Sequence, residues 1–322
     1  MYKMLSFEAR NKRQIKFGLS LVIICSAVLG CASKKDTHQG AAVPKKLHVV
    51  ATTSIVADTV KNIGKGALTV EALMDPGVDP HLYKASPGDI AKMNKADLIL
   101  YNGLHLEGKM SDVLEKLGRK KSTYAIAQPI SKEKLMFPSV GEGLPDPHVW
   151  MDVKLWAETI EPLAQKLGEL DPENQPAYIK NAEDYKKHLE QLDQGSRQKV
   201  QTIPDGQRVL ITAHDAFRYF GRAYGVQVLG VQGISTESEA GLKEINNLVS
   251  LIVKHHLPAV FIESSVSPKN VEALLEGAKS KGATVKLGGE LYSDALGEKS
   301  TPEGTYIGMI RHNVKTIVEA LQ

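Results

Sequence analysis

The chain alternates short apolar, β-branched runs with longer stretches in which apolar positions recur every three or four residues. In the first half, the short runs predict strands at 47–53, 68–74, 97–102 and 123–127, and the periodic stretches predict helices at 55–63 and 88–96. In the second half, strands are predicted at 208–213, 226–231, 259–263 and 284–287, and helices at 215–224, 238–256, 269–281 and 302–321. Repeated βα units of this kind predict parallel sheets covered by helices.

A charged, strand-free segment separates the two βα series. Residues 151–170 and 172–200 are helical in composition, and Pro172 stands where a helix start tolerates its missing N–H. The second stretch is long enough to bridge two lobes. The sequence therefore predicts an α/β fold with two lobes, each with a mainly parallel sheet flanked by helices: an N-terminal lobe at 47–171, a linking helix at 172–203 and a C-terminal lobe at 204–322. Ligands are expected at the carboxyl ends of the strands, in the cleft between the lobes.

The first 46 residues follow a different pattern. Basic residues up to Lys16 precede an uncharged run at 17–30, which is the layout of a secretory signal peptide and too short to span a membrane. The junction VLGC at 28–31 resembles a bacterial lipobox, in which the cysteine is lipidated. This predicts a signal peptide at 1–30, then a lipidated Cys31 and a flexible tether at 31–46. An ordinary signal peptide with an incidental cysteine is the alternative.

Composition excludes several classes of protein. A length of 322 residues suits two domains, and 42% hydrophobic residues is the content of a packed globular protein. Lysine and arginine outnumber aspartate and glutamate by only 40 to 37 and are spread along the chain, so no basic stripe suggests a nucleic-acid partner. The two cysteines are Cys25, inside the predicted signal peptide, and Cys31. The mature chain could therefore form neither an internal disulfide nor a cysteine-based metal site.

Three of the ten histidines stand out by their context. His81 lies in an Asp-Pro-His phrase after the second predicted strand, and His148 lies in a second such phrase that opens a helix. His214 follows the first predicted strand of the second lobe. Proline restricts the backbone before each of the first two imidazoles, which helps to hold a ligand in place. Asp294, in the loop after the last predicted strand, is the fourth candidate, so each lobe would supply two metal ligands.

Three imidazoles and one carboxylate suit Zn²⁺, Mn²⁺ or Fe²⁺ rather than Ca²⁺ or Mg²⁺. Four protein ligands would close a tetrahedral site without an open position for an activated water, which favours binding of one divalent transition metal over hydrolysis. Glu263, at the end of a strand, is a candidate fifth ligand or a hydrogen-bond partner that orients an imidazole. His105, which also follows a strand, is a candidate for a structural or hydrogen-bonding role beside the site.

A series of phrases in order resembles the zinc- and manganese-binding lipoproteins of bacterial ABC importers, the substrate-binding family of the TroA, PsaA and ZnuA type. The resemblance covers residues 48–321 and rests on VATTSI at 50–55, DPH at 79–81, YNGLHLE at 101–107, DPHVWMD at 146–152, TAHDAF at 212–217, QGIST at 232–236, FIESS at 261–265 and GELYSD at 289–294. It implies two α/β lobes joined by one rigid helix, with the metal at the lobe interface and only small lobe movement on release.

The resemblance carries the metal ligands over to His81, His148, His214 and Asp294. It also implies that the metal is a transported ligand, that the partner is the membrane permease of an ABC importer, and that the chain is a monomer anchored by Cys31 on the periplasmic or extracellular face of the cell membrane. Some manganese-selective members have glutamate at the place of His214. The histidine of this chain resembles the TroA-type site, which argues against exclusive use of manganese. Zinc-dedicated members often carry a histidine-rich loop, whereas residues 110–146 contain no histidine. The choice between Zn²⁺ and Mn²⁺ stays open.

Two other functions remain as alternatives. A secreted metal-dependent hydrolase could use the same ligands around an activated water, with Glu263 as the general base. A surface adhesin could hold the metal as a structural staple, in which case metal removal should unfold the chain.

Overall fold

The first half of the chain contains a four-stranded parallel sheet. The computed structural model describes residues 46–138 and 143–322 of the chain. The strands of this sheet run in the order β2-β1-β3-β4, with bounds β1 Leu47–Ala51, β2 Leu68–Ala72, β3 Leu98–Tyr101 and β4 Ser122–Ala125. The predicted signal peptide at 1–30, and Cys31 with the tether up to residue 45, lie outside the described residues.

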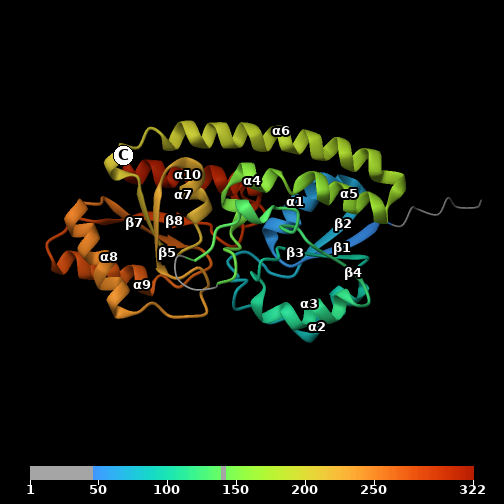
Figure 1. Cartoon of the computed structure of the whole chain (residues 1–322), viewed down its shortest axis with the longest axis horizontal. Helices are drawn as coiled ribbons and strands as arrows, with labels where there is room; N and C mark the ends of the chain where they lie inside the picture. Colours follow the sequence, from blue (N-terminus) through green and yellow to red (C-terminus); the bar gives the residue numbers. More distant parts are fainter. Residues whose placement is uncertain (1–45, 139–142) are drawn as a thin grey trace, which may run out of the picture. The chain divides into compact units, whose positions relative to one another are not determined.

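Helices cover both faces of this sheet (Figure 1), and they are α1 Ser54–Gly64, α2 Pro87–Lys95, α3 Ser111–Gly118, α4 Val153–Ala157 and α5 Ile160–Leu170. Val49 and Leu98 point to the core shared with α1 and α5, whereas Val50 and Ile99 point to the core shared with α2 and α3. Strands that are buried on both faces explain why the central runs are apolar without alternation. These elements are called the first lobe.

The second half contains two parallel strand pairs, made of β5 Val209–His214 with β6 Gln227–Gln232 and of β7 Ala259–Glu263 with β8 Lys286–Leu291. β5 and β7 lie side by side, which brings the two pairs together. The helices of this second lobe are α7 Arg218–Tyr224, α8 Leu242–His255, α9 Lys269–Ser280 and α10 Tyr306–Leu321. Val260 packs toward α8 and α9, and Phe261 toward α10, so these strands are also covered on both faces.

Helix α6, Gln175–Val200, is the longest helix of the described chain and runs along both lobes (Figure 1). Its 26 residues correspond to about 39 Å at 1.5 Å per residue. It contacts α1, α4 and α5 of the first lobe and α7 and α10 of the second. The buried residues recur every three or four positions and are Tyr178, Ala182, Tyr185, Leu189, Leu192, Ser196 and Val200. Among the described residues, no helix has the length and apolarity to cross a membrane.

The predicted fold class is confirmed: parallel sheets flanked by helices form two lobes, and a long helix connects them. Several predicted bounds were wrong. Pro172 starts a 3₁₀ turn, Pro172–Asn174, and α6 begins three residues later because Pro176 has no N–H to donate to the carbonyl of Pro172. The predicted helix at 151–170 is divided into α4 and α5, and α3 was not predicted. The lobe boundaries after residues 171 and 203 stay a prediction.

Candidate metal centre

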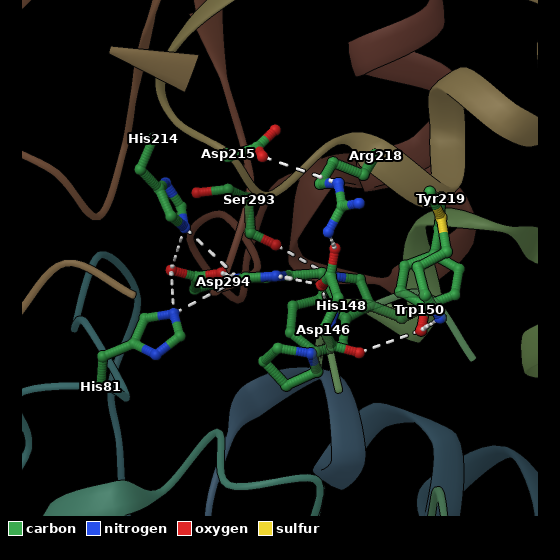
Figure 2. Close-up of polar contacts among 12 residues, drawn as sticks. His81, Asp146, His148, Trp150, His214, Asp215, Arg218, Tyr219, Ser293 and Asp294 are labelled. Atoms are coloured by element: carbon green, nitrogen blue, oxygen red, sulfur yellow. Dashed lines mark hydrogen bonds and ion pairs between the residues drawn. The ribbon is translucent and has the colours of Figure 1, made fainter. Parts of the chain in front are cut away.

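The structure brings the side chains of His81, His148, His214 and Asp294 together between the two lobes (Figure 2). One ligand atom from each lies within 4.8 Å of all the others, and all four residues are buried. His81 lies in the loop after β2, and His148 precedes a 3₁₀ turn, so the first lobe contributes both. His214 ends β5 and Asp294 follows β8. Parallel strands bring the second pair to one edge, because their carboxyl ends meet there.

The imidazole nitrogens and the carboxylate converge on a common point. His148 Nε2 lies 3.3 Å from His81 Nε2 and 3.4 Å from His214 Nε2. Asp294 approaches with both oxygens: Oδ1 lies 3.3 Å from His148 Nε2, and Oδ2 lies 3.3 Å from His214 Nε2. Neither oxygen has an aligned hydrogen-bond partner within the described part of the chain. A buried carboxylate without partners is costly unless a cation neutralises it, so these residues fit a metal ion.

Asp146 fixes the orientation of the His148 ring. Its Oδ1 accepts hydrogen bonds from the backbone N–H of His148 at 3.0 Å and from Nδ1 at 2.8 Å. With the proton held on Nδ1, the lone pair of the neutral ring lies on Nε2, the atom that faces the centre. The Trp150 ring packs edge-on against the same imidazole, with ring centroids 5.2 Å apart.

Glu263, on the neighbouring strand β7, fixes the orientation of the His214 ring. Its Oε2 lies 2.6 Å from His214 Nδ1, and its Oε1 accepts from the His214 backbone N–H at 2.8 Å. Both carboxylate oxygens are therefore directed at His214 rather than at the centre. Of the two roles considered for Glu263, this geometry favours the hydrogen-bond partner over the fifth ligand.

His81 is held differently. Asp79 Oδ1 accepts from the backbone N–H of His81 at 2.8 Å, which repeats the turn at Asp146, but its Oδ2 accepts from Thr236 of the second lobe at 2.5 Å. The second lobe thus contacts the turn that carries His81. His105 is exposed and makes no hydrogen bond to the four residues within the described chain, so its role beside the site stays a prediction.

The charges of the four residues are strongly coupled. Burial lowers the pKa of His81 to about 3, against the opposing effect of Asp294. Burial also acts to lower the pKa of His148, but the hydrogen bond with Asp146 and the negative charge of Asp294 outweigh it and raise this pKa to about 9. For His214, burial is outweighed by Glu263 and Asp294, which raise its pKa well above the usual value. Without a cation, protons therefore occupy part of the centre.

Contacts from helix α7 support the His148 loop and were not foreseen from the sequence. Tyr219 Oη donates to the carbonyl of Asp146 at 3.0 Å and accepts from the N–H of Met136 at 2.9 Å. Arg218 Nη1 lies 3.5 Å from Asp146 Oδ2, and its Nη2 donates to the carbonyl of Phe137 at 2.9 Å (Figure 2). The hydrogen bond from the His148 N–H to Asp146 could have been predicted from the sequence, since an aspartate side chain commonly accepts from the N–H of the residue two positions later. Arg218 gave no such signal.

The chain and its fold are similar to those of known metal-binding proteins. The family model described as ZnuA, zinc-uptake complex component A, periplasmic, matches residues 49–320. The chain is 50% identical over 297 residues to the manganese-binding lipoprotein MntA of Bacillus subtilis (strain 168), covering 92% of this chain and 95% of that protein. It is 46% identical over 303 residues to the zinc-binding protein TroA of Treponema pallidum (strain Nichols), with 92% and 98% covered. The solved structure of the periplasmic zinc-binding protein TroA from Treponema pallidum matches with a TM-score of 0.84 at 47% identity, covering 86% of this chain and 99% of that one.

Proposed function

Because the chain belongs to the ZnuA family of metal-binding components of ABC importers, we propose that it captures one divalent transition metal outside the cytoplasm and delivers it to the importer's permease. The observation that supports this most directly is the buried carboxylate of Asp294, which lies without an aligned hydrogen bond among three imidazole nitrogens. A cation at their centre satisfies all four groups at once. His81, His148, His214 and Asp294 are the proposed ligands of this cargo.

The donor set accommodates either Zn²⁺ or Mn²⁺, and Fe²⁺ is compatible with the same atoms. Three imidazoles with one oxygen of Asp294 form the four-coordinate arrangement that Zn²⁺ favours. Engagement of both oxygens adds the higher coordination that Mn²⁺ accepts, and the two oxygens face different histidines, His148 and His214. The two relatives described above carry the words manganese and zinc in their names at similar identity, so similarity does not choose between these metals.

Binding, rather than hydrolysis, fits the surroundings of the centre. A hydrolase requires a general base that is free to take a proton from a metal-bound water. Glu263 has both oxygens on His214, and Asp146 uses one oxygen for His148 and lies near Arg218 with the other. Four protein ligands also leave a tetrahedral ion without an open position. We therefore infer a receptor without catalytic activity.

The proposed location follows from the first residues and from the relatives. A lipoprotein anchor on Cys31, with a tether before β1, would hold a monomeric receptor at the periplasmic or extracellular face of the cell membrane, within reach of the permease. MntA, the relative at 50% identity, is named a lipoprotein. Mass spectrometry of the membrane-extracted protein would detect acylation of a chain that begins at Cys31, and Cys31→Ala should release the protein from the membrane.

Metal content tests the central proposal. The soluble chain from residue 32 onward is purified, analysed for metals, stripped with a chelator and titrated with Zn²⁺ and Mn²⁺ separately. We expect one equivalent of tightly bound ion, and loss of tight binding in Asp294→Ala and His148→Ala. Absence of a stoichiometric ion, or several weakly held ions that these substitutions leave unchanged, would overturn the proposal.

A further inference from the structure

A hollow of about 290 Å³ opens beside His81. His81 is the one proposed ligand on its wall, and it is 2% exposed, whereas the other three are 0–1% exposed. The wall combines both lobes and is largely apolar, with Leu106, Leu144, Pro147 and Ile234 among its residues. Among the four proposed ligands, His81 is therefore the one that borders this hollow and has the largest exposed fraction.

His105 and Glu237 bring polar groups to this largely apolar hollow from opposite lobes. His105 is exposed, and the Glu237 side chain is 42% exposed. A hydrogen bond from Lys109 lowers the pKa of Glu237, so its side chain carries a negative charge at the hollow that it lines together with His105 and His81. An imidazole and a carboxylate are donors suited to Zn²⁺ and Mn²⁺.

The backbone that carries His105 is strained. Gly103, Leu104 and His105 have φ of 85°, 54° and 68°, so three consecutive residues adopt the left-handed region, which only the glycine enters without cost. Buried Glu107 maintains this turn, because its carboxylate accepts from the N–H of Asn102 at 2.7 Å and from that of Gly103 at 3.2 Å. Strain of this kind persists only where surrounding contacts enforce it, and it is typical of functional positions.

The His105 ring packs closely against Gly108, which limits the positions that the ring can take. A Cβ added to Gly108 would lie 3.1 Å from His105 Nε2, so the ring packs directly against this glycine. On the opposite side of the hollow, Lys109 Nζ lies 2.8 Å from Glu237 Oε1 in an exposed ion pair between the two lobes. Both donors therefore line the hollow, one from each lobe.

We propose that His105 and Glu237 form an outer port that receives a hydrated divalent cation at the hollow and passes it to His81. This inference rests on the proposed function. A hydrated ion that enters an apolar passage loses water contacts at a large cost, and donors along the passage replace part of them. In the resting state, the ammonium of Lys109 neutralises Glu237, and the incoming cation displaces it.

Binding kinetics distinguish a port from a further ligand of the centre. A port lowers the barrier in both directions, so its loss slows association and dissociation by the same factor and leaves Kd unchanged. We expect His105→Ala and Glu237→Gln to slow both rates about tenfold, at the lower end of electrostatic effects on association. Lys109→Met, which frees the carboxylate of Glu237, should accelerate association. Stopped-flow mixing with Zn²⁺ or Mn²⁺ measures these rates through the fluorescence of Trp150, whose ring packs against His148.

Matched variants and equilibrium titration complete the test. Glu239→Gln and His255→Ala remove an exposed acid and an exposed imidazole that do not line the hollow, and they should leave the rates unchanged. Three results would each overturn the port: unchanged rates in both port variants, a weaker Kd at an unchanged association rate, or faster association in Glu237→Gln. The last result would mean that the ion pair between Lys109 and Glu237 only connects the two lobes. Failure of the wild-type chain to bind one equivalent would instead overturn the proposed function.

Discussion

Glu263 accepts two hydrogen bonds from His214, one from the backbone N–H at 2.8 Å and one from Nδ1 at 2.6 Å. The two residues are 49 positions apart and meet because β5 and β7 are neighbours. This pairing places the lone pair of His214 on the nitrogen that faces the metal centre. Orienting carboxylates of this kind determine metal affinity even though they do not touch the ion.

The first prediction concerns this pair. Glu263→Gln keeps the shape of the side chain but removes its charge, so the hydrogen bond to Nδ1 weakens. We expect metal affinity to fall about 10- to 100-fold with an unchanged stoichiometry. Competition titration against a chelator of known affinity measures the change. Glu276→Gln on the exposed surface of α9 is the matched control, and equal affinities of the two variants would contradict the assigned role of Glu263.

The second prediction concerns Asp294. Asp294→Ala removes the one negative ligand, so the cation should no longer stabilise the fold. A ligand at about 1,000 times its Kd raises the free energy of unfolding by about 4.1 kcal/mol, and this increment should vanish in the variant. Denaturant unfolding with and without the metal measures it, with Asp112→Asn as an exposed control. A metal-dependent increment that survives in Asp294→Ala would place the ion elsewhere.

The third prediction concerns pH. In the metal-free protein the pKa of His148 is raised to about 9 and that of His214 is raised well above its usual value, so both rings are protonated near neutrality. The cation must displace these protons, and its affinity therefore falls as pH falls, by about tenfold per pH unit for each proton released. His81, with a pKa of about 3, releases none near neutrality. Titrations from pH 6 to 8 should give a slope of about one to two protons, and a flat profile would contradict this.

The fourth prediction separates a cargo ion from a structural staple. Each lobe has a core made of covered strands and helices, and α6 packs on both lobes, so removal of the metal should leave the fold intact. Far-ultraviolet circular dichroism after chelation should match that of the metal-bound form. Loss of the cooperative unfolding transition on chelation would instead support the adhesin alternative, in which the ion holds the lobes together.

The fifth prediction concerns the long helix. Leu189 is fully buried in the stripe that α6 presents to the core, and Leu189→Ala should lower the free energy of unfolding by about 2–5 kcal/mol. Metal affinity of the folded fraction should stay unchanged, because Leu189 is not among the clustered donor residues. Urea unfolding and metal titration of the same preparation measure both quantities, and Glu190→Ala on the exposed face provides the control.

Features that depend on neighbouring residues were easier to predict from the sequence than features that depend on contacts between distant segments. The two Asp-Pro-His phrases led to the prediction of His81 and His148 as ligands. In the structure each phrase forms a local turn in which the aspartate accepts from the histidine N–H. The partnership of Glu263 with His214 depends on which strands are neighbours, and the sequence left Glu263 with two roles. The support from Arg218 depends on how α7 packs on the other lobe, for which no local pattern exists.

The missed helix and the shifted bounds have local causes. Helix α3, Ser111–Gly118, has only eight residues, which is too short for its apolar positions to establish a helical period. At the start of α6, Pro172 suggested a helix start, but the second proline at 176 removes the hydrogen bond that would close the first α-helical turn there.

The buried stripe of α6 has a mechanical consequence. A connection made of loops would let two lobes swing apart at little cost, whereas a helix packed on both lobes resists, because a change of lobe angle must bend a continuous hydrogen-bonded rod. The four donor groups are therefore held near one another by elasticity of the frame, independently of the cation between them. Release of the proposed cargo by opening the lobes would therefore require work to deform this frame, and a binding partner could supply that work.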